Sequence, residues 1–376
     1  MKNKRCIMKK YDVAAYVWPS YTGDEPRTRI FWPEGYGEWE TVREAVARFE
    51  GHTWPRKPLW GYLNEADPYV MEMQIEAAVD HGVNVFIYDW YWYDNRPFLE
   101  QCLDNGFLKA KNRSKMKFYI MWANHTVNHI WDRRISDTKP DSVIWNGRVN
   151  GETFRTIGKR WMDMYFTQPE YYTIDNKPVV SIYDPTNFIS GLGGIEKARE
   201  EMQWLDGEVK KMGYDGMHFQ LVMYGKVRED LREFGGDVTQ YEVHEFVKLL
   251  PFSSVTHYQT CSIVDVNRNY CEITEDIKKE WKRIDENYDI PFMPHVSLGW
   301  DDTPRFKSHT KYIVKNNTPE EVEKVFRDAK EYADSHGVSL ITVNSWNEWT
   351  ETSYLQPDDL YGYGYLDAVK NVFCKE

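Results

Sequence analysis

Two glutamates near the C-terminal end of the sequence, Glu348 and Glu351, are spaced so that they could perform acid–base chemistry. They follow a short β-branched run at residues 340–344 that is typical of a buried strand. Trp346 and Trp349 lie beside them. One carboxyl group can act as an acid and the other as a base, and flat indole rings stack on the C–H faces of a sugar ring. The segment therefore indicates sugar chemistry, although most Glu-x-x-Glu pairs are merely solvated surface side chains.

The composition restricts the kinds of partner. The chain has 376 residues, a formal net charge of -12 and an aromatic content of 16%, with 16 Trp and 26 Tyr. An acidic chain without a basic block is a poor partner for nucleic acid or an anionic membrane. So many aromatic residues suit a carbohydrate-binding cleft, although some of them can simply fill a large core.

The cysteines and the N-terminal residues bear on location. The count of five cysteines is odd and contains no C-x-x-C pair, which predicts reduced thiols. Residues 1–10 are basic but precede no apolar stretch long enough for a signal peptide, and no apolar run reaches the length of a membrane span. We therefore expect a cytoplasmic protein, with a periplasmic or secreted location left open if a leader precedes this sequence.

Strand and helix patterns alternate along the whole chain. Eight strands are predicted, at residues 12–18, 83–88, 117–122, 178–183, 218–223, 237–241, 291–297 and 340–344. Helices are predicted at residues 68–81, 98–105, 153–166, 194–212, 227–234, 273–287, 319–336 and 362–373. Eight such units predict an α/β fold, a parallel (β/α)8 barrel of the TIM type. Because no repeat or linker interrupts residues 1–376, we expect one domain with long loops after the first and third strands.

Active residues of such a barrel follow the strands, where their side chains meet at one end of the barrel. The candidates for substrate binding are Tyr16, Asp89, Trp90, Trp122, Asn124, His125, Tyr241, His295, Trp300 and Asn347. A lone Asp after a strand is more often a helix cap than a catalyst. His125 and His129 have zinc-like spacing but no third ligand, so no metal site is predicted. The glycine-rich residues 191–194 lack the spacing of a phosphate loop, and no cofactor is expected.

Several of these segments carry a family resemblance. The C-terminal segments Ser-Trp-Asn-Glu-Trp-Thr-Glu (345–351), Leu-Gln-Pro-Asp (355–358) and Tyr-Gly-Tyr-Gly-Tyr-Leu (361–366) resemble the closing signature of the WbsX-like proteins, which are related to glycoside hydrolase family 99. Residues 68–75, 82–93 and 122–124 fit the same family. The similarity extends over nearly the whole chain, and Asn-Glu-Trp-x-Glu is its most specific part.

The resemblance implies a metal-independent retaining α-glycosidase on a (β/α)8 barrel, typified by endo-α-mannosidases. It implies that Glu348 is the base that takes a proton from the substrate's own 2-hydroxyl, giving a 1,2-anhydro sugar. It implies that Glu351 is the general acid and then the base, with Asn347 binding or orienting at the same site. An acid must hold its proton, and a like-charged neighbour such as Glu348 raises the pKa of Glu351 in the required direction.

Two other functions stay open at this point. WbsX-like chains often carry a glycosyltransferase label, but metal-dependent nucleotide-sugar transferases usually have an Asp-x-Asp motif, and this sequence has none. The other alternative is a carbohydrate-binding barrel without turnover, against which the intact Glu pair argues. In each case the expected partner is an oligosaccharide or polysaccharide.

Overall fold

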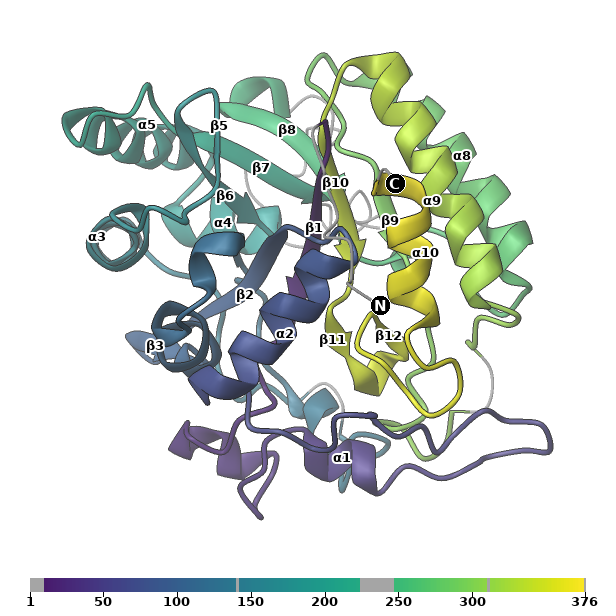
Figure 1. Cartoon of the computed structure of the whole chain (residues 1–376). Helices are drawn as coiled ribbons and strands as arrows, with labels where there is room; N and C mark the ends of the chain where they lie inside the picture. Colours follow the sequence, from purple (N-terminus) through teal and green to yellow (C-terminus); the bar gives the residue numbers. More distant parts are fainter. Residues whose placement is uncertain (1–9, 140–141, 224–246, 310–311, 375–376) are drawn as a thin grey trace.

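The core of the computed structural model is a parallel barrel. The structure describes residues 10–139, 142–223, 247–309 and 312–374. The barrel strands are β1 (Asp12–Val17), β2 (Val85–Tyr93), β4 (Lys117–Trp122), β6 (Lys177–Ile182), β7 (His218–Met223), β8 (Phe252–His257), β9 (His295–Ser297) and β10 (Leu340–Asn344). They pair in the order β8-β7-β6-β4-β2-β1-β10-β9, each in parallel with its neighbour (Figure 1). The prediction of an α/β TIM barrel is confirmed.

A single bridge brings the two ends of this sheet together. Val255 of β8 donates to Pro291 O at 3.0 Å, and Met293 donates back to Val255 O at 2.8 Å. These bonds form a parallel bridge between Val255 and Phe292, just before β9. The eight strands therefore enclose a common interior.

Helices cover the outside of the barrel. They are α2 (Pro68–Asp80), α3 (Gly151–Trp161), α4 (Pro185–Leu192), α5 (Ile195–Lys211), α8 (Tyr270–Asn287), α9 (Pro319–His336) and α10 (Gly364–Phe373), whereas α1 (Trp39–Arg43) lies in the loop after β1 at one end of the barrel. Their ends follow local chemistry: Asp67 caps α2 by accepting from Tyr69 N at 2.8 Å, and Thr318 caps α9. Gly337, at φ 67°, ends α9 in the left-handed region that glycine tolerates.

Short elements sit in the connections. They are β3 (Arg96–Phe98), β5 (Thr173–Ile174), β11 (Asn347–Glu348) and β12 (Ser353–Tyr354). The predicted helix at residues 98–105 is wrong in its first half, because β3 pairs with β2, and a π-helical turn (Cys102–Gly106) and a 3-10 turn (Phe107–Lys109) follow it. The loop containing α1 and the β11–β12 hairpin lie toward the same end of the barrel, at the bottom of Figure 1.

One barrel strand escaped the sequence prediction. β8 lies in a segment to which no element was assigned, whereas the predicted strand at 237–241 and helix at 227–234 fall outside the described residues. The inward side chains of β8 are polar: Ser254 contacts His218, and Thr256 contacts Thr342 at 2.8 Å. A strand whose buried face is hydroxylic shows no apolar alternation.

The cysteines differ in their redox state. Cys374 is disulfide-bonded, so the prediction of reduced thiols is wrong there, although Cys102, Cys261 and Cys271 are free. Disulfides form in oxidising compartments, so the cytoplasmic location stays a prediction.

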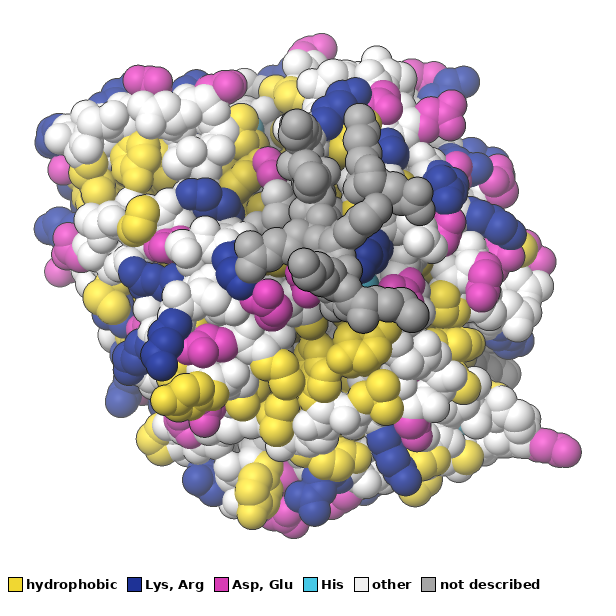
Figure 2. Space-filling view, in the orientation of Figure 1, with side chains coloured by type: hydrophobic (Ala, Val, Ile, Leu, Met, Phe, Trp, Pro, Cys, Tyr) yellow, Lys and Arg dark blue, Asp and Glu magenta, His cyan; other side chains and the backbone are white. Residues whose placement is uncertain are grey.

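Basic and acidic side chains are interspersed on the face shown in Figure 2. Within the described parts of the chain, no helix has the length and apolar character needed to cross a bilayer.

Candidate active site

A buried arginine, Arg305, gathers three glutamates at the end of the barrel. Its Nε donates to Glu38 Oε1 at 2.8 Å, its Nη1 to Glu351 Oε1 at 2.5 Å, and its Nη2 to Glu348 Oε1 at 3.4 Å. Glu348 and Glu351 follow β10, Glu38 precedes α1 in the loop after β1, and Arg305 lies in the loop after β9. The Trp18 ring lies 5.9 Å from the guanidinium and donates from Nε1 to Glu38. Loops from distant parts of the chain thus meet around one cation.

The turn that carries the two glutamates is fixed by hydrogen bonds. Ser345 Oγ accepts from Glu348 N at 2.7 Å and donates to Ser353 O at 2.6 Å. Tyr21 Oη accepts from Trp349 N at 3.0 Å. These bonds fix the backbone of the turn, and Arg305 holds the side chains of both glutamates.

The electrostatic environment differs between the two glutamates. Burial raises the pKa of Glu351 well above its usual range, and the adjacent charge of Glu348 raises it further. Burial also raises the pKa of Glu348, but Arg305 and the Tyr258 hydroxyl lower it in opposition. The upward pKa shift is the larger at Glu351, where the charge of Glu348 adds to burial, whereas Arg305 is the largest influence opposing burial at Glu348. The pair can supply one neutral acid beside one ionised base.

A fourth buried carboxyl group, Asp89, is linked to the pair. Tyr258, which follows β8, places its hydroxyl 2.9 Å from Asp89 Oδ2 and 2.9 Å from Glu348 Oε2. Asp89 Oδ1 is buried and has no hydrogen-bond partner among the described residues. Burial, followed by the charge of Glu348, raises the pKa of Asp89 well above its usual range.

Aromatic side chains surround these groups. Trp131 contacts Trp18 at 5.0 Å between ring centroids, Tyr91 at 6.0 Å and His125 at 5.7 Å. Tyr183 meets His125 at 5.6 Å and Tyr258 at 5.3 Å. Burial lowers the pKa of His125, which favours a neutral ring. Such rings can stack on the apolar faces of a sugar.

Four predicted substrate-binding residues lie in or next to this cluster. Asp89 and His125 do so by the contacts above, and Tyr16 packs on Tyr258 at 4.9 Å from the barrel interior. Asn347 is fully buried and binds Trp18 through both backbone N and O, at 2.8 and 2.9 Å, and Glu65 Oε2 at 2.7 Å. Its amide is thus already used in holding the loops after β1 and β10 together.

The other predicted residues are placed elsewhere. Because successive strand residues face opposite sides, Trp90 and Trp122 point outward and pack on Trp161 at 5.5 and 5.8 Å. Asn124 bonds Asp184 from both ends of its amide, at 2.7 and 2.8 Å, and ties β4 to β6.

The last three predicted residues are His295, Trp300 and Tyr241. His295 bonds Thr342 and Ser297 inside the barrel, at 2.9 and 3.0 Å. Trp300 is half-buried in the loop after β9. Tyr241 lies outside the described residues.

Sequence analysis missed Arg305, Glu38 and Tyr258. Glu38 lies in the long loop after the first strand, and the length of that loop was the available signal. Tyr258 comes directly after β8, so recognising that strand would have found it. Arg305 lies five residues after Trp300, the nearest predicted residue, and carries no signal of its own. In the described chain, no three His, Cys, Asp or Glu side chains are grouped to hold a metal ion.

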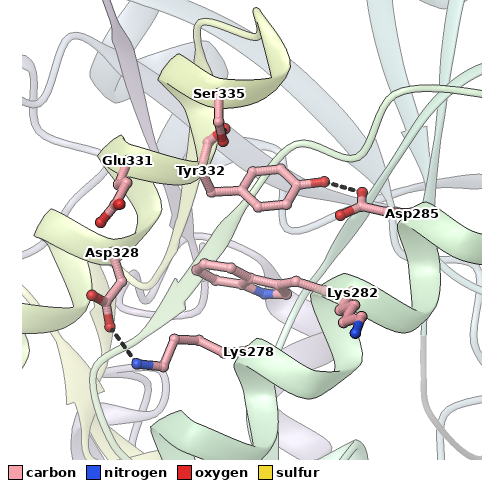
Figure 3. A pocket seen from close by; sticks show the side chains of 8 residues that line it. Lys278, Lys282, Asp285, Asp328, Glu331, Tyr332 and Ser335 are labelled. Carbon is pink, nitrogen blue, oxygen red and sulfur yellow. Dashed lines mark hydrogen bonds and ion pairs between the residues drawn. The ribbon is translucent and has the colours of Figure 1, made fainter.

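A groove on the outer wall of the barrel is separate from this site. It lies between α8 and α9 and is lined by Trp281, Tyr332 and charged side chains (Figure 3). Two polar contacts lie within it: Lys278 lies 3.3 Å from Asp328, and the Tyr332 hydroxyl donates to Asp285. Trp281 packs on Phe292, behind β9.

The fold and the site together define a class, the (β/α)8 barrels that gather buried polar side chains at the carboxyl ends of their strands. Within it, the chain belongs to the WbsX family, because the family model described as "Glycosyltransferase WbsX" matches residues 13–369. The resemblance found in the sequence is thereby confirmed.

Relatives and solved structures agree with this placement. The protein WxcX of Xanthomonas campestris pv. campestris, itself described as uncharacterized, is 24% identical over 361 residues, covering 93% of this chain and 48% of the relative. The chain thus spans about half the length of the curated relatives it matches. The glycoside hydrolase family 99 endo-α-mannosidase of Bacteroides thetaiotaomicron aligns over 97% of both chains, with 16% identity and a TM-score of 0.59. A structure titled "Glycoside hydrolase-like protein" aligns over 99% of this chain and 97% of its own, with 15% identity and a TM-score of 0.60. At these identities the structures show a shared fold.

Proposed function

We propose that the chain is a retaining glycoside hydrolase that cleaves an α-linked, mannoside-like glycan. One observation carries the proposal: Glu348 and Glu351 are buried together around Arg305 in unequal surroundings, and the pKa of Glu351 is raised the more strongly of the two. This is the division of labour that glycoside cleavage demands of two carboxyl groups. The aromatic rings around the pair supply the surfaces on which a sugar can stack.

In the proposed first step, Glu348 removes the proton from the substrate's 2-hydroxyl and the oxygen attacks C1. Glu351 donates its proton to the departing glycosidic oxygen, so that a 1,2-anhydro sugar and a free alcohol form. Glu351, now ionised, then takes a proton from water as that water attacks C1. The bond between C1 and O2 breaks as the water attacks, O2 regains its proton from Glu348, and both glutamates return to their starting states.

Arg305 serves both steps in this scheme. Its contact with Glu351 at 2.5 Å stabilises the carboxylate that appears once the proton has left. Its weaker contact with Glu348 at 3.4 Å favours the ionised base at the start. A fixed cation that meets charge as it develops is the usual means of lowering such barriers.

The test is a product screen on α-linked mannans, rhamnans, galactans and glucans, without nucleotide sugar or metal, read by mass spectrometry. We expect release of reducing sugar by the wild type and a loss of roughly 10²–10⁴-fold in Glu351→Gln and in Glu348→Gln. Glycan binding should persist in Glu351→Gln, because the amide keeps the shape of the acid. Full activity of Glu351→Gln on an unactivated substrate would refute its role as the acid. Cleavage of a 2-deoxy substrate would refute the anhydro route.

A glycosyltransferase is the second candidate, and the description of the matching family model favours it. The same screen separates the two functions. Transfer that appears only after nucleotide sugars are added, with no release in their absence, supports the transferase. Binding without either reaction supports a non-catalytic carbohydrate-binding barrel.

A further inference from the structure

The Tyr258 hydroxyl poses a problem of proton count. It lies 2.9 Å from an oxygen of Asp89 and 2.9 Å from an oxygen of Glu348. Each of these contacts needs a hydrogen between its two oxygens, and a phenol carries only one. Burial raises the pKa of Tyr258 well above its usual range, so the phenol keeps that hydrogen. One of the two carboxyl groups must therefore be neutral and donate to the phenol oxygen.

The surroundings decide which carboxyl group that is. Glu348 has Arg305 Nη2 at 3.4 Å from its other oxygen, and a cation favours the charged form. The other oxygen of Asp89 is buried, and no described residue donates to it. An ionised Asp89 would be a buried charge without a cation, which is the costlier arrangement.

We propose that Asp89 is kept as a neutral acid whose hydrogen bond to Tyr258 aims the phenol proton at Glu348, so that Glu348 stays ionised. Asp89 and Tyr258 are then positioning residues that act through Glu348. The inference rests on the proposed function in that it assigns Glu348 as the base, but the protonation of Asp89 can be measured without any turnover.

The other groups around these two carboxyls are consistent with this assignment. Asp89 faces Tyr16 of β1, Tyr91 of β2 and Tyr183 after β6. These are phenols, and burial raises the pKa of each of them well above its usual range. Glu348 faces Arg305 from the loop after β9, Glu38 from the loop after β1, and its neighbour Glu351. Arg305 is the one cation among these named groups, and it contacts Glu348.

The direct test is infrared difference spectroscopy at pH 7 of wild type against Asp89→Asn. We expect the difference spectrum to contain the C=O band of a protonated carboxyl group. Asp334→Asn is the matched control: Asp334 is exposed, and its hydrogen bond to Lys10 lowers its pKa, so its loss should remove only carboxylate bands. Carboxylate bands for Asp89 as well would overturn the proposal, whether or not the protein hydrolyses any glycan.

The functional test is the pH profile of kcat/KM on a substrate found in the screen. Asn can donate from its amide to Tyr258 as the neutral acid does, so Asp89→Asn should leave the acid limb of the profile unmoved. Tyr258→Phe removes a donor to Glu348, so the acid limb should move up by about one pH unit. A downward shift in Asp89→Asn would mean that Asp89 had been ionised and had held the phenol proton itself. An acid limb of the kcat/KM profile that does not move in Tyr258→Phe would show that the phenol does not keep Glu348 ionised.

Discussion

Arg305 is the residue on which the charge balance of the site depends. Its three donor nitrogens reach Glu38, Glu348 and Glu351, and its side chain is 5% exposed. If all three glutamates were ionised, the cluster would carry an excess of two negative charges in a water-poor interior. Such an excess is relieved by protonation. The excess therefore favours a proton on at least one of the three glutamates, and the proposed scheme assigns it to Glu351, where the charge of Glu348 adds to burial.

Arg305→Lys tests this residue without removing the positive charge. A lysine has one compact ammonium group and cannot present a planar fork to three carboxylates. We expect a loss of about 1–3 kcal/mol in the free energy of unfolding, because buried acceptors lose their donors. Urea unfolding measures it. Arg96→Lys is the matched control, since Arg96 is 61% exposed beside Asp94 and its replacement should cost less than about 0.5 kcal/mol. Equal effects in the two variants would show that the shared contacts contribute little.

At the level of elements, the loop after β1 is fastened to the loops that carry the acid. Trp54 Nε1 donates to Thr352 Oγ1 at 2.9 Å, and Thr352 in turn donates to Asp301 O at 3.1 Å. Asp301 N donates to Glu351 O at 2.8 Å, and His52 Nε2 lies 2.7 Å from Asp301 Oδ2. The position of Glu351 thus depends on a segment some 300 residues away in sequence.

Trp54→Phe removes the hydrogen bond from Trp54 to Thr352 and keeps an aromatic ring in place. Thr352 loses a buried partner, which should cost about 1 kcal/mol of stability and speed amide exchange at residues 349–353. Hydrogen exchange followed by mass spectrometry gives the readout. Trp60→Phe is the comparison, because the bond of Trp60 to the Tyr363 hydroxyl at 2.9 Å is solvent-exposed. Unchanged amide exchange at residues 349–353 in Trp54→Phe would show that the Trp54–Thr352 bond does not hold the segment that carries Glu351.

Sequence patterns predicted this fold in most of its elements but only part of the site. The apolar runs of β1, β2, β4 and β10 are visible because helices bury their outer faces. β8 is not visible in this way, since Ser254 and Thr256 face the barrel interior. Glu348, Glu351 and Asp89 come directly after or within strands that were found. Arg305, Glu38 and Tyr258 were missed because tertiary contacts, with no local pattern, bring them to the pair.

On the scale of the whole molecule, buried acids and buried histidines oppose each other in the pH dependence of stability. Burial raises the pKa of Glu65 and of Asp104 to about 7, so each contributes stability that is complete below about pH 4 and is lost as the pH rises to about 7. Burial lowers the pKa of His218 and of His257 to about 4, and their contribution grows from about pH 4 to about pH 6.5. A single pH curve of the wild type therefore mixes two opposite slopes.

The Glu65→Gln variant separates the contribution of a buried acid to the pH dependence of stability from that of the buried histidines. Glu65 accepts hydrogen bonds from Gln74, Gln356 and Asn347, at 3.0, 2.8 and 2.7 Å. The histidines titrate alike in both proteins. From pH 5 to pH 7, the free energy of unfolding of the wild type should therefore fall by roughly 2–3 kcal/mol relative to that of the variant. Denaturant unfolding across that range gives the curve. Glu320→Gln should give a flat difference, because the pKa of Glu320 is lowered by its hydrogen bond to Thr318 and the group is ionised throughout. A flat line for Glu65→Gln would contradict its raised pKa.

The place of β1 in the sheet has a consequence for synthesis on the ribosome. β1 lies between β2 and β10, with Asp12 opposite Leu340 and Ala15 opposite Val343. At a typical rate of about 10 residues per second, roughly half a minute passes between the emergence of the two strands. One edge of β1 stays open to other chains for that time, because its partner has not yet been made. Production of this protein should therefore depend on holding chaperones, and slower translation should lower the soluble yield.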